Sequence, residues 1–103
     1  MRVLAFGLVG NVQFLCKMFA DTGAEIMLIV SPTDKSIEGM NYIYPHQRIL
    51  LNIKKDVAQV MELIADVDVL IENFRPGVLE AAGLTKEKVH ELNPKLIYVK
   101  LTG

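Results

Sequence analysis

Two neighbouring features of the sequence could serve chemistry at the end of a strand. Glu72 follows the expected strand 67–71 and could act there as an acid–base group, although such a carboxylate more often has a hydrogen-bonded structural role. Arg75-Pro76-Gly77 comes directly after it. On spacing alone these three residues are typical of a turn with a solvated arginine, and a ligand-binding cation is the alternative.

A glycine pair near the start of the chain suggests a dinucleotide-binding turn. Gly7-Leu8-Val9-Gly10 follows an apolar run, as in nucleotide-binding α/β domains. The third glycine of that pattern is missing, and the next strand does not end in the acidic residue expected to bind a ribose. We therefore interpret these residues as a tight strand-to-helix turn.

Residues that could act as nucleophiles or metal ligands are few. Cys16, the single cysteine, lies on the apolar side of an expected helix, which favours buried packing over nucleophilic reactivity. One cysteine excludes an internal disulfide and a cysteine-based zinc site, and this usage fits a reducing compartment. His46 and His90 lack a second histidine at metal-ligand spacing, so we interpret both as surface residues and predict no metal.

Apolar runs alternate with segments of helical period along the chain. We expect strands near 2–8, 25–30, 48–53, 67–72 and 95–101. Helical segments are expected from about residue 12 to Gly23, over 57–64 with Asp56 as N-cap, over 78–82, and from Thr85 to Asn93. The stretch 31–47 is expected to be a surface excursion. Continuous apolar strands separated by amphipathic helices indicate an α/β fold, with a parallel sheet covered by helices on both faces.

This architecture predicts where a ligand binds. In open α/β sheets the binding crevice lies beyond the carboxyl ends of the strands. The segments expected there are 7–13, 30–34, 53–55 and 72–77.

Three stretches of the sequence resemble the family III CoA-transferases, a family that also contains the α-methylacyl-CoA racemases. The most specific stretch is 65–80, Ala-Asp-Val-Asp-Val-Leu-Ile-Glu-Asn-Phe-Arg-Pro-Gly-Val-Leu-Glu, and 92–103 and 19–26 support it. The resemblance implies that 1–103 is an amino-terminal, Rossmann-like segment of the large domain that binds coenzyme A. It also implies that the fold is incomplete relative to the full family fold, with the catalytic remainder and the small domain absent from this chain.

The resemblance also implies which residues bind coenzyme A. Carried over position by position, the contacts fall on Leu51, Lys54, Asn73, Phe74 and Arg75. The physical chemistry of these side chains suits the role, because a lysine and an arginine bind phosphate as a point charge and as a fork. The phenylalanine offers an apolar face, and the asparagine supplies a donor and an acceptor together. No catalytic residue is assigned, because the family's catalytic groups would lie downstream of Gly103.

The family implies two reactions on acyl-CoA. The short path from Val30 to Arg48 and the stretch 96–103 look more like the racemases, which move a proton at the carbon next to the thioester. Glu72-Asn73-Phe74 looks more like the transferases, which move CoA between carboxylic acids. We give the racemase a slight preference and expect this chain to be inactive alone. A homodimer, or association with a full-length relative, is the implied assembly.

Composition and charge exclude other classes of partner. The net charge is −1 and there is no basic cluster, so we expect no nucleic acid. The apolar runs are far shorter than a membrane helix requires, and the first residues read as a strand and not as a signal peptide. We expect a cytoplasmic location, or an organelle matrix (mitochondrion or peroxisome) in a eukaryote. Two other functions stay open: a nicotinamide-nucleotide module and a non-catalytic interaction fragment.

Overall fold

The computed structural model describes residues 1–6, 10–30 and 47–101. It contains strands β1 (Arg2–Phe6), β2 (Glu25–Val30), β3 (Gln47–Leu50), β4 (Val69–Glu72) and β5 (Ile97–Lys100). The helices are α1 (Gly10–Asp21), α2 (Val57–Ala65), α3 (Val78–Ala81) and α4 (Lys86–Leu92). Some expected features lie outside the described residues: most of the turn at 7–10, almost all of the excursion at 31–47, His46, and the end of the stretch 92–103.

The strands form one parallel sheet in the order β3-β2-β1-β4-β5. This confirms the α/β fold with a parallel sheet, and each expected strand range contains or overlaps the observed strand. β1 is the central strand, with Val3 opposite Ile26 on one side and Val69 on the other. β3 and β5 are the two outermost strands.

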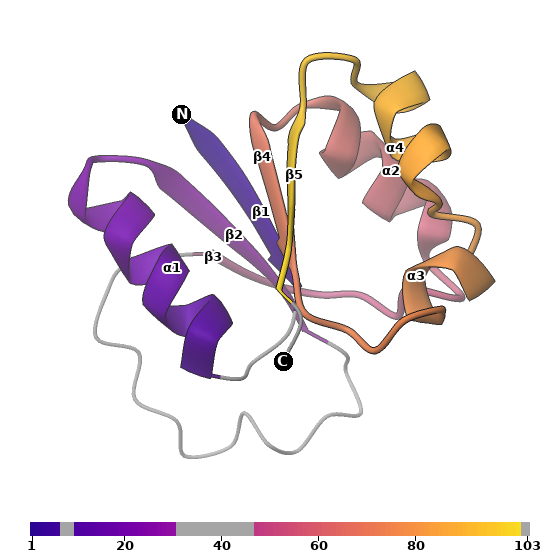
Figure 1. The fold of residues 1–103 in the computed structure, drawn as a ribbon, viewed down its shortest axis with the longest axis horizontal. Helices are drawn as coiled ribbons and strands as arrows, with labels where there is room; N and C mark the ends of the chain where they lie inside the picture. The colour runs from indigo at the N-terminus through magenta and orange to yellow at the C-terminus, as the bar shows by residue number, and fades with distance from the viewer. Residues whose placement is uncertain (7–9, 31–46, 102–103) are drawn as a thin grey trace.

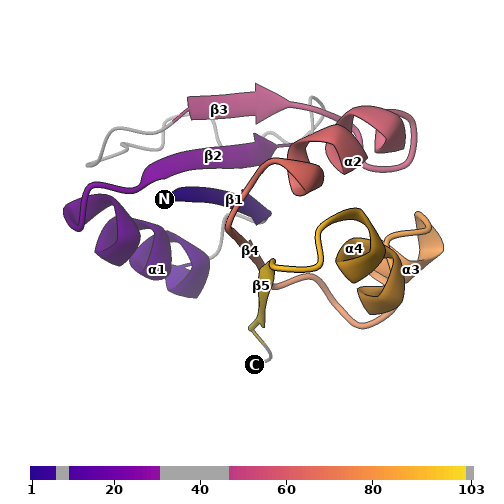
Figure 2. The same cartoon turned by 90° about the horizontal axis from the view of Figure 1, so that it is seen from above.

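Helices cover both faces of the sheet, as predicted. α1 packs on one face, while α2, α3 and α4 lie on the other (Figures 1 and 2). The connection from β1 to β2 runs in one direction along the sheet on the α1 face. The connections from β3 to β4 and from β4 to β5 run in the opposite direction on the opposite face, so all three crossovers have the same hand, as parallel connections require.

The central strands are apolar over most of their length because both of their faces are buried. In β1, Leu4 and Phe6 point into the core under α2, α3 and α4, whereas Val3 and Ala5 point into the core under α1. All four side chains are fully buried. This double burial explains why the sequence shows a continuous apolar run here and no alternation.

The starts of two helices were predicted with different success. Thr85 caps α4, because its hydroxyl accepts a hydrogen bond from the backbone N–H of Lys88 at 3.1 Å, as predicted. Asp56 lies at the N-cap position of α2, but its side chain makes no capping bond. Its carboxylate accepts the backbone N–H of Asn52 at 2.8 Å instead, so the side chain stabilises the preceding loop and not the helix.

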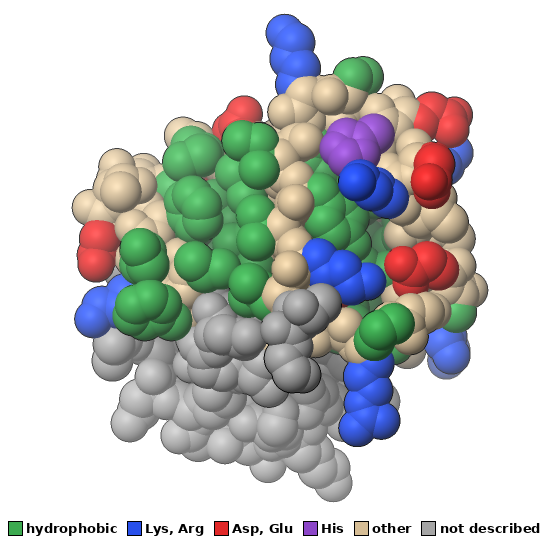
Figure 3. All heavy atoms as spheres, in the orientation of Figure 1, with side chains coloured by type: hydrophobic (Ala, Val, Ile, Leu, Met, Phe, Trp, Pro, Cys, Tyr) green, Lys and Arg blue, Asp and Glu red, His purple; other side chains and the backbone are tan. Residues whose placement is uncertain are grey.

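Several large apolar side chains are exposed on the α1 side of the molecule. Ile97 on β5 is 60% exposed, and Phe14 and Met18, one turn apart on α1, are 65% and 51% exposed. Figure 3 shows hydrophobic side chains gathered over α1 and the neighbouring part of the sheet. Within the part of the chain that the structure describes, α1 therefore covers β5 only in part. Within that same part, no helix is long and apolar enough to cross a membrane.

Candidate functional site

Because the strands are parallel, their carboxyl ends all lie on one side of the sheet, here called its carboxyl edge. The predicted site residues lie there. Leu51 and Lys54 follow β3, and Asn73, Phe74 and Arg75 follow β4. β2 and β1 lie between β3 and β4, so the two groups occupy separate positions along this edge. The side chains of Leu51 and Phe74 both pack against the same core, the one under α2, α3 and α4. That shared core connects the two halves of the predicted site.

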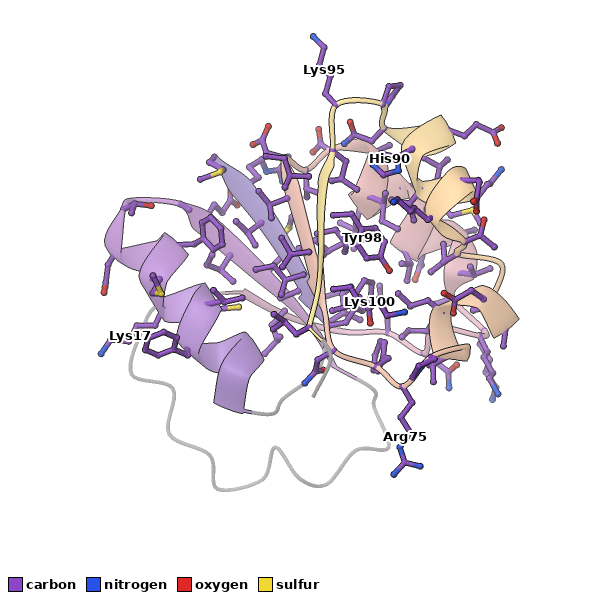
Figure 4. The ribbon with its side chains drawn as sticks, viewed as in Figure 1. Lys17, Arg75, His90, Lys95, Tyr98 and Lys100 are labelled. Atoms are coloured by element: carbon purple, nitrogen blue, oxygen red, sulfur yellow. The ribbon has the colours of Figure 1, made fainter. Side chains whose placement is uncertain are left out.

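The segment after β4 presents one aromatic and one cationic side chain. Phe74 is partly buried, and its ring lies against the ring of Phe6, with centroids 5.8 Å apart and planes tilted by 42°. Arg75 is exposed and points away from the body of the molecule (Figure 4). Among the described residues no carboxylate forms an ion pair with Arg75, so its guanidinium can bind an anion. Gly77 follows with φ +93°, a left-handed conformation that suits glycine and lets the chain turn into α3.

The loop after β3 has a backbone fixed by its own side chains. The side-chain oxygen of Asn52 accepts the backbone N–H groups of Lys54 and Lys55, at 3.0 and 3.1 Å. The Asp56 carboxylate in turn accepts the backbone N–H of Asn52. The Lys54 side chain therefore extends into solvent from a well-defined loop, which suits a contact with a phosphate group.

Glu72, the last residue of β4, is only 1% exposed. One carboxylate oxygen, Oε2, accepts the backbone N–H of Phe74 at 2.9 Å. The other oxygen, Oε1, accepts the hydroxyl of Tyr98 at 3.1 Å and lies 3.9 Å from the ammonium nitrogen of Lys100. The interpretation of Glu72 as a hydrogen-bonded structural carboxylate is therefore confirmed.

Tyr98 and Lys100 are the members of this site that the sequence analysis missed. The parallel register puts Lys100 opposite Glu72 and Tyr98 opposite Leu70, so all of them project from the same face of the sheet. Burial raises the pKa of Tyr98, and the neighbouring Glu72 carboxylate raises it further, which keeps the hydroxyl protonated as a donor. The signal available in the sequence was the two-residue spacing from 98 to 100, matching that from 70 to 72.

The other candidate residues are not part of this edge. Cys16 is 2% exposed in the core under α1, and burial raises its thiol pKa to about 11, which confirms that it packs as a core residue. His90 on α4 lies 3.1 Å from the carbonyl oxygen of Lys86, through its ring nitrogen Nδ1. In residues 1–6, 10–30 and 47–101 no three His, Cys, Asp or Glu side chains form a group that could hold a metal.

A hollow next to this edge includes only one of the predicted contacts. It lies between α2 and the outermost strand β3, and Leu51 forms part of its wall. The remaining lining side chains are Ile49, Gln59, Glu62, Leu63 and Asp66. Two carboxylates at its rim make it a poor match for a phosphorylated ligand.

Open parallel α/β sheets bind ligands beyond the carboxyl ends of their strands, and the two cations and the aromatic ring of the predicted site lie there. The sequence profile described as CoA-transferase family III matches residues 1–103, and this chain belongs to that family. Its resemblance to the family, first seen in 19–26, 65–80 and 92–103, is thereby confirmed.

Individual relatives support the same assignment. The chain is 34% identical to the succinyl-CoA--D-citramalate CoA-transferase of Chloroflexus aurantiacus, over 99% of this chain and 29% of the relative. It is 31% identical to a formyl-CoA:oxalate CoA-transferase of Escherichia coli, over 99% of this chain and 28% of the relative. The crystal structure of Rv3272 from Mycobacterium tuberculosis superposes with a TM-score of 0.89 at 25% identity, covering 100% of this chain and 32% of that one. The chain thus spans less than a third of the length of each of these proteins.

Proposed function

We propose that this chain forms the coenzyme A-binding part of an enzyme that acts on acyl-CoA thioesters. In this proposal residues 1–103 are the amino-terminal segment of a large Rossmann-like domain, and the catalytic groups and a small domain come from outside them. The observation that carries the proposal is the exposed guanidinium of Arg75, which has no ion-pair partner among the described residues, beside the partly buried ring of Phe74 at the carboxyl edge of a family III CoA-transferase sheet.

Each predicted contact has a defined part in this proposal. Arg75 and Lys54 bind phosphate groups of coenzyme A, because both are exposed cations on ordered segments. Phe74 and Leu51 provide apolar surface for the adenine or the pantetheine arm, since both are held by the same core. Asn73, directly before Phe74, adds an amide that can both donate and accept a hydrogen bond.

Transfer of CoA between carboxylic acids is the reaction that the relatives favour. The two relatives compared above are both named as CoA-transferases. The second candidate is racemisation of a 2-methylacyl-CoA, the preference from the sequence, and it is supported by the stretch 96–103. Both reactions use acyl-CoA and involve no metal in this proposal.

The proposal includes a larger assembly. The large apolar side chains of Ile97, Phe14 and Met18 are exposed on the α1 side of the molecule, where a partner would cover them, which supports a homodimer or association with a full-length relative. A cytoplasmic or organelle-matrix location is part of the same proposal.

Isothermal titration calorimetry of the purified chain with coenzyme A tests this proposal. We expect binding of coenzyme A and no comparable binding of NAD⁺, since the glycine pattern of a nicotinamide site is incomplete. Binding of NAD⁺ without coenzyme A would instead support a nicotinamide-nucleotide module. Binding of neither would leave a non-catalytic interaction fragment as the better description.

The two candidate reactions are separated in an assembly that turns over. Exchange of the proton at carbon 2 of a 2-methylacyl-CoA in heavy water, followed by NMR, indicates racemisation. Appearance of a new acyl-CoA from a free carboxylic acid indicates transfer.

A further inference from the structure

The buried carboxylate of Glu72 lies next to the segment that carries three of the five proposed coenzyme A contacts. We propose that Glu72 is a positioning residue, which holds the backbone of 73–75 in the conformation that binds coenzyme A and is itself held by Tyr98 and Lys100. This inference rests on the proposed function, because it assumes that coenzyme A binds to this segment.

Glu72 is hydrogen-bonded directly to the backbone of the segment 73–75. Oε2 of Glu72 accepts the backbone N–H of Phe74 at 2.9 Å, two residues along the chain. Hydrogen bonds to an ionised acceptor are stronger and more directional than those between neutral groups. The bond fixes the peptide unit between Asn73 and Phe74, and it thereby sets the direction in which the neighbouring side chains leave the backbone. With that peptide fixed, the ring of Phe74 rests against Phe6 and Arg75 extends into solvent.

The carboxylate of Glu72 cannot turn away from this position. Oε1 accepts the hydroxyl of Tyr98 at 3.1 Å, and the ammonium group of Lys100 lies 3.9 Å from the same oxygen. Both partners come from β5 and point toward the same side of that strand (Figure 4). The backbone N–H of Leu101 also donates to the carbonyl oxygen of Glu72 at 2.8 Å. Side chain and backbone of Glu72 are thus held by β5 while one oxygen stays directed at Phe74.

Glu72 is too deeply buried to contact a ligand directly. The residue is 1% exposed, and both of its carboxylate oxygens already have partners. It therefore cannot serve as an acid–base group on a substrate, and any effect on binding passes through the segment 73–75. A buried carboxylate is costly compared with an apolar side chain of similar volume. An apolar side chain, however, could not accept the Phe74 N–H.

Glu72→Gln is the most direct test, because it keeps the shape and removes one of the two acceptor atoms. If the amide nitrogen of glutamine takes the place of Oε2, it cannot accept the N–H of Phe74. If it takes the place of Oε1, it cannot accept the hydroxyl of Tyr98. We expect coenzyme A affinity, measured by calorimetry on the 103-residue chain, to fall about tenfold, in the range seen when a charged hydrogen bond is lost. The Phe74 amide should also exchange its proton faster in NMR. Glu87→Gln, the same change at an exposed position on α4, should leave affinity unchanged.

A double-mutant cycle with Arg75→Ala distinguishes positioning from general destabilisation. If Glu72 acts by orienting 73–75, the loss of coenzyme A affinity caused by Glu72→Gln should be smaller in the Arg75→Ala background. One of the side chains that Glu72 orients is then already absent. A purely structural loss would be the same in both backgrounds. Tyr98→Phe, which removes one donor to the carboxylate and leaves the fold intact, should weaken binding in the same direction by a smaller factor. This second variant keeps the test valid should Glu72→Gln not fold.

The outcomes separate this inference from the proposed function. Coenzyme A binding by the unmodified chain, with unchanged affinity in Glu72→Gln and Tyr98→Phe or with fully additive losses in the cycle, overturns the inference alone. Absence of coenzyme A binding by the unmodified chain overturns the proposed function and this inference with it.

Discussion

The side-chain amide of Asn93 donates a hydrogen bond to the backbone carbonyl oxygen of Val67 across 2.7 Å. The same nitrogen lies 2.9 Å from the carbonyl oxygen of Ile64, near the end of α2. Asn93 itself follows the last residue of α4. One amide group therefore ties the end of α4 to the end of α2 and to the connection that follows α2, and at Ile64 it satisfies a carbonyl group that the helix end leaves without a partner.

Asn93→Asp should destabilise the protein by about 1–3 kcal/mol, the cost of leaving buried hydrogen-bonding groups unpaired. The aspartate has the same shape but cannot donate, and its charge would face two carbonyl oxygens. Urea unfolding followed by circular dichroism measures the change. Gln59→Glu makes the same chemical change at an exposed position on α2 and should have little effect. Equal free energies of unfolding for the two variants would contradict the structural role of Asn93.

Arg75→Ala should weaken coenzyme A binding by about 1–3 kcal/mol through loss of a charged hydrogen bond to phosphate. The difference from the unmodified chain should shrink at high salt, because Arg75 is exposed and its charge is screened. Calorimetry at two salt concentrations tests both statements. Lys95→Ala is the matched control, because it removes a similar exposed charge just before the amino end of β5, on the side of the molecule opposite Arg75 (Figure 4). Unchanged affinity in Arg75→Ala would remove Arg75 from the site.

Cys16 should react slowly with a thiol reagent in the native protein. Burial raises the pKa of its thiol from 9.0 to about 11, so at pH 8 only about one thiol in a thousand is ionised, and only the thiolate reacts. Because the folded state favours the protonated thiol, the raised pKa of Cys16 contributes to the free energy of unfolding. That contribution is present below about pH 9 and is lost as the pH rises toward 11. Colour development with an aromatic disulfide reagent, with and without 6 M urea as the comparison, measures the difference. Rapid stoichiometric labelling of the native chain would show that Cys16 is accessible.

The purified 103-residue chain should show neither transferase nor racemase activity. Both reactions need a carboxylate or an acid–base pair held against the thioester. Within the described residues Glu72 is the one buried carboxylate, and its oxygens are occupied by Phe74 and Tyr98. An assay with an acyl-CoA donor and a carboxylic acid acceptor, and one with a 2-methylacyl-CoA, test this expectation. Turnover in either assay would mean that the catalytic residues have been misplaced.

The elements of the fold could be predicted because their signals are local. The apolar runs gave the five strands, and glycine and capping residues gave most of the helix ends, with Thr85 as a clear case. Asp56 shows the limit of this reasoning. A carboxylate before a helix has two possible backbone donors, one in the helix and one in the preceding loop. Here it bonds to the loop at Asn52, a choice that depends on the path of the chain after β3.

The candidate site was predicted where consecutive residues form it and missed where the sheet forms it. Phe74 and Arg75 lie in one short segment whose residue types already suggest a role in binding. Tyr98 and Lys100 join Glu72 only through the parallel register of β4 with β5, which brings together residues 26 and 28 positions apart. Single-sequence periodicity cannot supply that register. The bonds of Asn93 were missed for the same reason, because Asn93-Pro94 alone indicates only the end of a helix.

The central position of β1 has a consequence for the order in which the protein assembles during synthesis. β1 leaves the ribosome before both of its partner strands, and its pairing with β2 joins residues 23 positions apart, such as Val3 and Ile26. Its other partner, Val69, is 66 positions away, and closing this larger loop costs about 1 kcal/mol more in chain entropy. Until β4 has been synthesised, β1 therefore presents an open edge, with apolar side chains at residues 3–6, to other nascent chains. Ribosome-bound chains that end before β4 are accordingly expected to aggregate or to bind a chaperone, and chains that extend beyond Lys100 to be released from it.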